Sequence, residues 1–183
     1  GKTVAGSHGG GATTTAVVPS AISGVVLPAG VQATEYNFGE IELAGISGIV
    51  YLDRNRSGGF DDNGVDGLIS GVAVALHAGS GCSGQLLGTA LTNSLGQFAF
   101  DGLETGLPYT VCETQPPAFG QGSDRPGAGG SSNAPNVITI ASLPSGGSTG
   151  HQFGERSGSI SGYVYLDAAN DGQRSGDTGI PEV

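Results

Sequence analysis

The chain has 183 residues, 36 of them glycine and nine proline, and carries 16 acidic residues against six basic ones, a net charge of −10 at pH 7. Such a surface repels nucleic acid and anionic lipid headgroups and attracts divalent cations. Calcium is therefore the expected partner, and no binding of nucleic acid is expected. No apolar run reaches the roughly 18 residues of a membrane helix, so no segment is expected to span a membrane.

Three blocks of sequence occur twice, in the same order along the chain. LPAG at 27–30 matches LPSG at 143–146, NFGE at 37–40 matches QFGE at 152–155, and ISGIVYLD at 46–53 returns as ISGYVYLD at 160–167. A spacing of more than 100 residues is the size of a domain. The repeats predict the C-terminal part of one repeat at 1–44, a complete repeat at 45–157 and the start of another at 158–183, cut from a longer polypeptide.

The complete repeat alternates short apolar runs with glycine-rich turns, a pattern typical of a two-sheet β-sandwich with very little helix. The join between repeats is short, so successive domains are expected to form a semi-rigid rod. The predicted strands are Ile46–Leu52, Val72–His77, Leu86–Thr92, Gln97–Phe100, Tyr109–Glu113, Val137–Ala141 and Gly150–Phe153.

An acidic loop directly follows the first predicted strand. Its alternating Asp, Asn and Ser side chains, with Gly58 at the sixth position, fit a calcium loop, because calcium takes about six to eight oxygen ligands. Ser57 replaces the usual acid and Asp66 comes two residues late, which predicts a lower affinity. The alternative is an ordinary solvated turn. The expected ligands are Asp53, Asn55, Ser57, Gly59, Asp61 and Asp66.

The equivalent loop of the next repeat offers a second, weaker calcium site. Ala169 and Ser175 take positions where a ligand would be expected, and the final acid comes one residue early. A metal-free turn is again the alternative. The expected ligands here are Asp167, Asp171, Gln173 and Asp177.

Cys82 and Cys112 are the two cysteines of the chain. Their spacing does not match a metal-binding motif, and an even pair in an extracellular chain most simply forms a disulfide, with two buried thiols as the alternative. The three histidines, His8, His77 and His151, are scattered without the spacing of a catalytic triad, so no enzymatic activity is expected.

The stretch from Pro116 to Pro135 is rich in Gly, Pro and Ser and predicts a long surface loop. Such loops often hold binding specificity, although a flexible connector is the simpler interpretation. Either role would place the segment outside the sheets.

Several blocks together resemble a known family: SGIVYLD with its acidic loop, GVAVAL, NSLGQFAFDGLETGLPYTVCETQP and the closing NFGE or QFGE. They are similar to the B repeats of serine-aspartate-repeat surface proteins, relatives of the collagen-adhesin B-type domain. The resemblance implies an immunoglobulin-like, reversed-topology β-sandwich, used as a tandem spacer on bacterial surfaces and often binding calcium. Many collagen-adhesin B-type domains also form a Lys to Asn or Asp bond assisted by a Glu, which Glu113 matches. The complete repeat has no lysine, so it cannot form that bond.

The sequence therefore predicts an extracellular, cell-surface stalk or fibre repeat, stiffened by calcium and a disulfide. Its expected partners are the neighbouring repeats and other copies in a filament. The alternative is an adhesive module that binds a matrix or host ligand, or a neighbouring chain, through the 116–135 loop or an edge strand.

Overall fold

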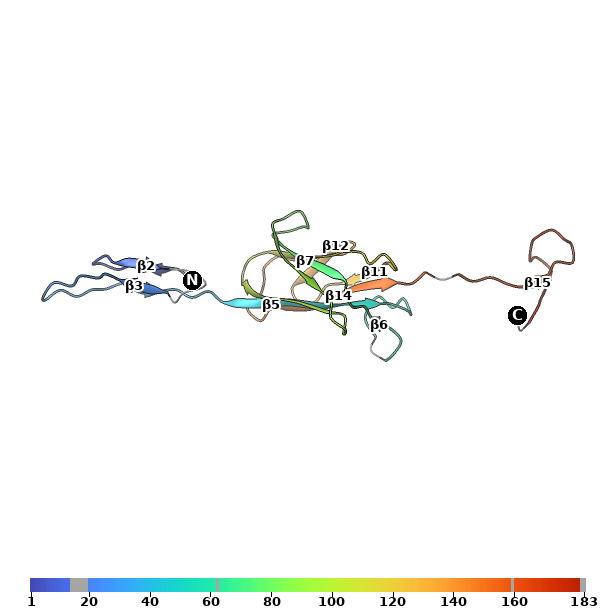
Figure 1. Ribbon diagram of the computed structural model, residues 1–183, viewed down its shortest axis with the longest axis horizontal. Coiled ribbons are helices and arrows are strands. Elements are labelled where there is room, and N and C mark those ends of the chain that lie inside the picture. Colours follow the sequence, from blue (N-terminus) through green and yellow to red (C-terminus); the bar gives the residue numbers. More distant parts are fainter. Residues whose placement is uncertain (14–19, 62, 159, 182–183) are drawn as a thin grey trace.

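The computed structural model describes residues 1–13, 20–61, 63–158 and 160–181, and Leu43–Arg156 fold into two packed β-sheets (Figure 1). The described ranges contain no helix, and so none that is long and apolar enough to cross a membrane.

The first sheet has five antiparallel strands in the order β12-β13-β10-β7-β8. Its three inner strands have β-branched and other apolar residues at alternate positions, which suits a sheet with one buried face. Their bounds are Ala73–Ala78 for β7, Tyr109–Glu113 for β10 and Val137–Ile140 for β13, with Leu86–Leu91 for β8 and Gly130–Ala134 for β12 at the edges.

The second sheet is built on β5 (Leu43–Leu52), the first strand of the sandwich. One side of β5 pairs antiparallel with β9 (Gln97–Glu104) and, further along, with β6 (Gly67–Leu68). Its other side pairs in parallel with β14 (Ser148–Arg156), the last strand, which in turn pairs with β11 (Gly120–Arg125). The first and last strands therefore run side by side in the same direction.

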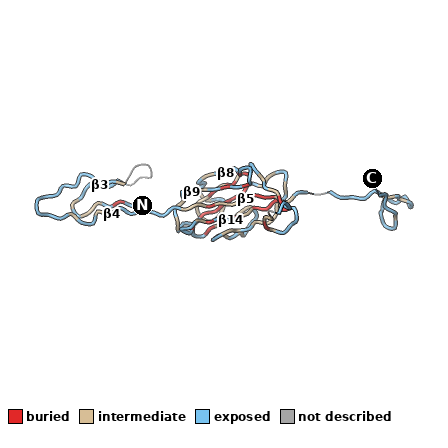
Figure 2. Tube along the Cα trace, turned by 90° about the horizontal axis from the view of Figure 1, so that it is seen from below, coloured by how far each residue is buried: buried red, intermediate tan, exposed pale blue. Residues whose placement is uncertain are grey.

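The hydrophobic core lies between the sheets, where the buried residues concentrate (Figure 2). Val50 and Phe153 of the second sheet are completely buried, as are Val111 and Ile138 of the first. Phe153 also packs on Phe98, with ring centroids 5.9 Å apart. Since each such side chain contributes about 1.5–3 kcal/mol by burial, this cluster is the main source of stability.

The expected all-β, immunoglobulin-like sandwich of reversed topology is confirmed, and a strand lies at each of the seven predicted positions. The predicted 116–135 surface loop is wrong, because this stretch contains β11 and β12. Both are edge strands in their sheets, held by backbone pairing to β14 and β13. An edge strand can be held by backbone pairing with few apolar side chains. The Gly, Ser and Asp residues of β11 and β12 therefore show no alternation of apolar and polar residues from which a strand could be predicted.

Two extended segments leave the sandwich at opposite ends (Figure 1). The N-terminal one pairs β1 (Thr3–Val4) with β4 (Asn37–Phe38) and β2 (Gly11–Thr13) with β3 (Ala21–Ser23), and the C-terminal one pairs β15 (Tyr165–Leu166) with β16 (Thr178–Gly179). Residues 14–19, 159, 182 and 183 of the predicted partial repeats lie outside the described residues.

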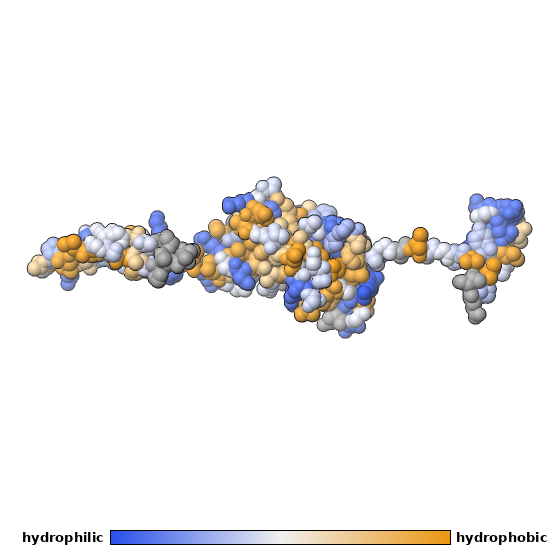
Figure 3. Space-filling model, in the orientation of Figure 1, coloured by the Kyte–Doolittle hydropathy of each residue, from blue (hydrophilic) through white to orange (hydrophobic). Residues whose placement is uncertain are grey.

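Apolar side chains are exposed on both segments (Figure 3). Ile160 is fully exposed, whereas Ile46, at the same place in the repeated block, is fully buried. Val164 is 55% exposed, against 0% for the equivalent Val50. The same block of sequence therefore buries its apolar side chains in the sandwich, where a second sheet covers them. In the C-terminal segment no sheet formed by the described residues covers them, and they are exposed.

Candidate functional site

The first acidic loop joins β5 to β6 and is organised by two carboxylates. Asp53 accepts hydrogen bonds from the backbone N–H groups of Ser57 and Gly58, both at 3.0 Å. Asp66 accepts from the N–H groups of Arg54 and Asp61, both at 2.9 Å. Both carboxylates are more than nine-tenths buried. The loop is therefore folded around its first and last acids.

The second acidic loop, between β15 and β16, repeats this arrangement. Asp167 accepts from the N–H groups of Asp171 at 3.1 Å and Gly172 at 2.9 Å, and Asp177 accepts from Ala168 at 3.4 Å. Asn170 has a positive φ of 53°, matching 59° at Arg56 of the first loop. The two loops share one turn although the second is three residues shorter between its framing acids.

The loops differ in how many carboxylates they bring together. One oxygen from each of Asp167, Asp171 and Asp177 lies within 4.8 Å of the others, and no other such group occurs in the parts of the chain that the structure describes. In the first loop Ser57 takes the place of Asp171. Three converging carboxylates repel one another, and a hard cation would relieve that repulsion.

The other predicted ligands of the first loop supply neutral oxygens or make local bonds. The Asn55 side-chain oxygen accepts from Ser57 N–H at 2.9 Å, and Ser57 Oγ donates to the Gly59 carbonyl at 2.9 Å. Asp61 instead accepts from the backbone and side chain of Asn63, at 3.1 and 2.7 Å. In the second loop Gln173 donates its N–H to Asp171 at 2.8 Å. The Gly59 carbonyl and Asp61 are thus engaged in hydrogen bonds within the first loop, and among the described residues three carboxylates converge in the second loop alone.

The predicted disulfide is present, with Cα atoms of Cys82 and Cys112 6.0 Å apart. It joins the loop after β7 to β10. The same loop is also tied down by Thr110, whose Oγ1 accepts from Gly81 N–H and donates to the Gly79 carbonyl, both at 2.8 Å. The bridge therefore fixes this loop against the first sheet.

Two glutamates are buried where the sheets face each other. Glu113 of β10 is 7% exposed and Glu155 of β14 is 0% exposed. Burial, then the charges of Glu155 and Asp124, raise the pKa of Glu113 to about 9. Burial likewise raises the pKa of Glu155 to about 7. The Glu113 position was noted from the family resemblance, whereas Glu155 was missed, although its place in the repeated NFGE and QFGE blocks was a signal.

Ser148 and His151 of β14 form a second buried polar group. Gly127 N–H donates to His151 Nδ1 at 2.9 Å, so the ring proton is on Nε2, which donates to Ser148 Oγ at 2.8 Å. Ser148 Oγ donates in turn to the Ala128 carbonyl. Both residues are 0% exposed, and burial lowers the pKa of His151. The pair anchors the chain before β12 to β14.

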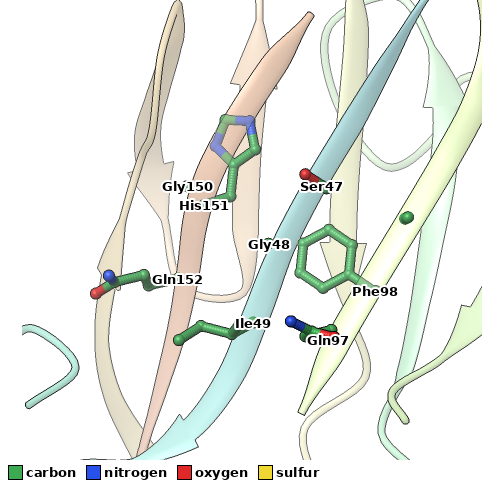
Figure 4. A pocket seen from close by; sticks show the side chains of 9 residues that line it. Ser47, Gly48, Ile49, Gln97, Phe98, Gly150, His151 and Gln152 are labelled. Carbon is green, nitrogen blue, oxygen red and sulfur yellow. The ribbon is translucent and has the colours of Figure 1, made fainter. Parts of the chain in front are cut away.

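A shallow groove of about 410 Å³ crosses β14, β5 and β9 near His151 (Figure 4). Gly48 lies on β5 between His151 of β14 and Phe98 of β9. A Cβ atom on Gly48 would lie 2.3 Å from the His151 carbonyl oxygen. Glycine at this position is what allows β5 and β14 to approach so closely.

Comparison with known proteins gives one family match and distant structural similarity. The model of the SdrD B-like domain matches residues 44–146, more than half of the chain. No curated protein matches the chain. It is similar to GBS52, the minor pilin of Streptococcus agalactiae, at 11% identity over 67% of this chain and 48% of that one, with a TM-score of 0.42. It is also similar to the shaft pilin SpaA of Lactobacillus rhamnosus GG, at 14% identity over 66% and 51%, with a TM-score of 0.37. The chain thus spans about half the length of these structures.

Proposed function

The chain belongs to the family of SdrD B-like domains, and from this membership we propose that it is a structural spacer repeat of a secreted, cell-surface stalk or fibre. One observation carries the proposal. The first and last strands of the sandwich are parallel neighbours, so the chain enters at one end and leaves at the other (Figure 1). Repeats joined in this way extend end to end, with the neighbouring repeats as their first partners.

This geometry suits a protein under tension. A pull on the two flanking segments draws β5 and β14 in opposite directions along their own axes. The two strands are paired in parallel from Gly48 with His151 to Leu52 with Glu155. Because the hydrogen bonds of a parallel pair are slanted and evenly spaced, all of them bear the pulling force together. Both strands also have partners on their outer sides, which keeps them within the sheet.

Calcium would stiffen the end at which the chain leaves the sandwich. Asp53 begins the first acidic loop and donates its backbone N–H to the Glu155 carbonyl of β14 at 2.8 Å. Phe60, further along the loop, donates its N–H to the Gln152 side chain at 3.0 Å. An ion bound in this loop would therefore brace β14 next to the join with the following repeat.

We expect saturating calcium to raise the midpoint of thermal unfolding above that in chelator, because an ion that binds only the folded state stabilises it. The gain is about 2.7 kcal/mol at a hundredfold excess over Kd. For a sandwich of this size that corresponds to roughly 10 °C. Differential scanning calorimetry of the whole chain measures it.

Matched variants assign the effect to its loop. Asp66→Asn should remove most of the rise in the midpoint of the sandwich, whereas Glu104→Gln, at an exposed acid outside the loops, should keep it. Asp177→Asn changes an acid of the second loop, and so distinguishes the contribution of that loop to the midpoint from the contribution of the first loop. If the midpoint of thermal unfolding were identical with calcium and with chelator, both loops would be metal-free turns.

The adhesive alternative loses one of its two supports, because the 116–135 segment is not a free loop. Its other support was an edge strand that could pair with a ligand or a neighbouring chain. β8 is such an edge strand, and its Leu86 and Leu91 are 56% and 68% exposed. The spacer role rests instead on the strand arrangement of the whole sandwich and is the function that this geometry supports best.

A further inference from the structure

The connection between β11 and β12 crosses from the second sheet to the first at one edge of the sandwich. β11 ends at Arg125 and β12 begins at Gly130, so residues 126–129 make the crossing. Both strands are edge strands with few apolar side chains of their own. The contacts that hold this connection on β14 therefore decide whether that edge of the sandwich stays closed.

Hydrogen bonds tie the connection to the start of β14. Gly127 N–H donates to Nδ1 of His151 at 2.9 Å. Ala128 N–H donates to the Thr149 carbonyl at 3.0 Å, and the Ala128 carbonyl accepts from the Ser148 hydroxyl. Nε2 of His151 donates in turn to Ser148 Oγ at 2.8 Å. The imidazole ring therefore holds Gly127 directly and orients the hydroxyl that holds Ala128.

The ring of His151 is tightly enclosed. It is 0% exposed, and so is Ser148. A Cβ atom on Gly130 would lie 2.8 Å from Cε1 of the ring and 3.2 Å from Cγ2 of Ile138. The ring thus packs directly on the backbone of β12, and its surroundings suit the neutral form in which Nδ1 accepts and Nε2 donates.

No charged group balances a proton on this ring. The connection, β12 and β13 have no ionisable side chain. Burial is the main cause that lowers the pKa of His151, a backbone hydrogen bond of Ser148 opposes it, and no charge is among the causes. The ionisable groups of the other strands around the site, none of which acts on the ring in this way, are Tyr51 of β5, Asp101 and Glu104 of β9, Tyr109 and Glu113 of β10, Asp124 and Arg125 of β11, and Glu155 and Arg156 of β14.

We propose that His151 is an acid-sensitive clasp, whose neutral ring holds the β11–β12 connection on β14 and whose protonation releases it. A proton on Nδ1 would face the Gly127 N–H group, so an acceptor would become a donor and that hydrogen bond would be lost. The buried positive charge would also have no partner. Acid should therefore open this edge of the sandwich and uncover β14, whether or not the chain serves as a spacer.

The direction of the pH effect follows from the lowered pKa of His151. The ordinary pKa is 6.5, so as the pH falls the unfolded chain takes up this proton before the folded chain does. Above pH 6.5 the ring is neutral in both states and the clasp is fully stabilising. Below it this stabilisation is lost, because the unfolding constant gains up to about tenfold per pH unit until the folded ring is protonated as well.

Urea unfolding of the whole chain from about pH 7.5 to about pH 4.5 tests the proposal, in chelator so that calcium binding does not contribute. Below pH 6.5 the unfolding constant of the wild type should rise by up to about tenfold more per pH unit than that of His151→Gln. The glutamine amide can accept from Gly127 N–H but does not titrate. His8→Gln, in the N-terminal segment, should keep the wild-type pH dependence. The carboxylates are the same in all three chains, so equal pH dependence in His151→Gln and the wild type would overturn the clasp.

Nuclear magnetic resonance of the wild-type imidazole rings provides a readout that requires no variant to fold. At neutral pH the nitrogen shifts of His151 should be those of a neutral ring with its proton on Nε2. As the pH falls, protonation of this ring and loss of hydrogen-exchange protection at the Gly127 amide should occur together. A ring with its proton on Nδ1 at neutral pH, or one that is protonated while the Gly127 amide stays protected, would overturn the proposal. None of these results bears on the calcium-dependent midpoint, so a failed clasp and a failed spacer are distinguishable.

Discussion

Reduction of the Cys82–Cys112 disulfide is expected to lower the free energy of unfolding by about 3.5 kcal/mol. The bond closes a loop with a sequence separation of 30 residues, and the chain-entropy model assigns that loss to the freedom regained by the unfolded chain. For a sandwich of this size the midpoint of thermal unfolding should fall by roughly 10–15 °C. Calorimetry with and without reductant measures the difference.

Cys82→Ala separates the bond from the packing of its sulfur atoms. Cys82 is exposed in the loop after β7, whereas Cys112 is buried on β10, so this variant breaks the bond and leaves the buried sulfur in place. The variant should unfold like the reduced wild-type chain and should not respond to reductant. If oxidised and reduced chains unfold at the same midpoint, the loop is held by Thr110 and the bond contributes little.

Gly48→Ala is expected to destabilise the sandwich by about 3 kcal/mol or more. The added methyl group would lie 2.3 Å from the His151 carbonyl oxygen and 2.7 Å from Cζ of Phe98. The Phe98 ring can turn, but the carbonyl belongs to the backbone of β14, so relief requires the parallel pair to separate. Overpacking of a rigid site commonly costs 1–3 kcal/mol, and a clash with backbone is at the upper end.

The chain offers a matched control for this change. Gly162 occupies the same position in the repeated block and has nothing within 4 Å of its Cβ direction. Chemical denaturation should therefore give the same stability for Gly162→Ala as for the wild type. If Gly48→Ala were equally harmless, β5 and β14 would not be in the close contact that the account requires.

The sequence predicted the parts of this fold that depend on local pattern. Alternation in AVALHA and VITI indicated buried strands, because one face of each packs on the core. The disulfide followed from an even pair of cysteines in a chain that was expected to be extracellular. By contrast, β11 and β12 are held by backbone pairing at sheet edges, where Gly, Ser and Asp leave no alternation to detect.

The parallel pairing of β5 and β14 could not be predicted from the sequence either, because strand order depends on contacts between residues about 100 positions apart. The same holds for the burial of the two glutamates. Glu113 was visible through the family resemblance, whereas Glu155 becomes buried only when the two sheets close. The positions of the two acidic loops were easier to predict, since their turn is set by hydrogen bonds between residues close together in the chain. Calcium binding by these loops stays a prediction.

We propose that the sandwich resists tension through its parallel first and last strands. Single-molecule pulling tests it by comparing two attachments on the same chain. Pulling from the two termini loads β5 and β14 along their axes, whereas pulling from Glu42 and Gly146 separates the same ends of both strands and peels them apart. The account predicts a several-fold higher unfolding force from the termini; an equal or lower force would contradict it.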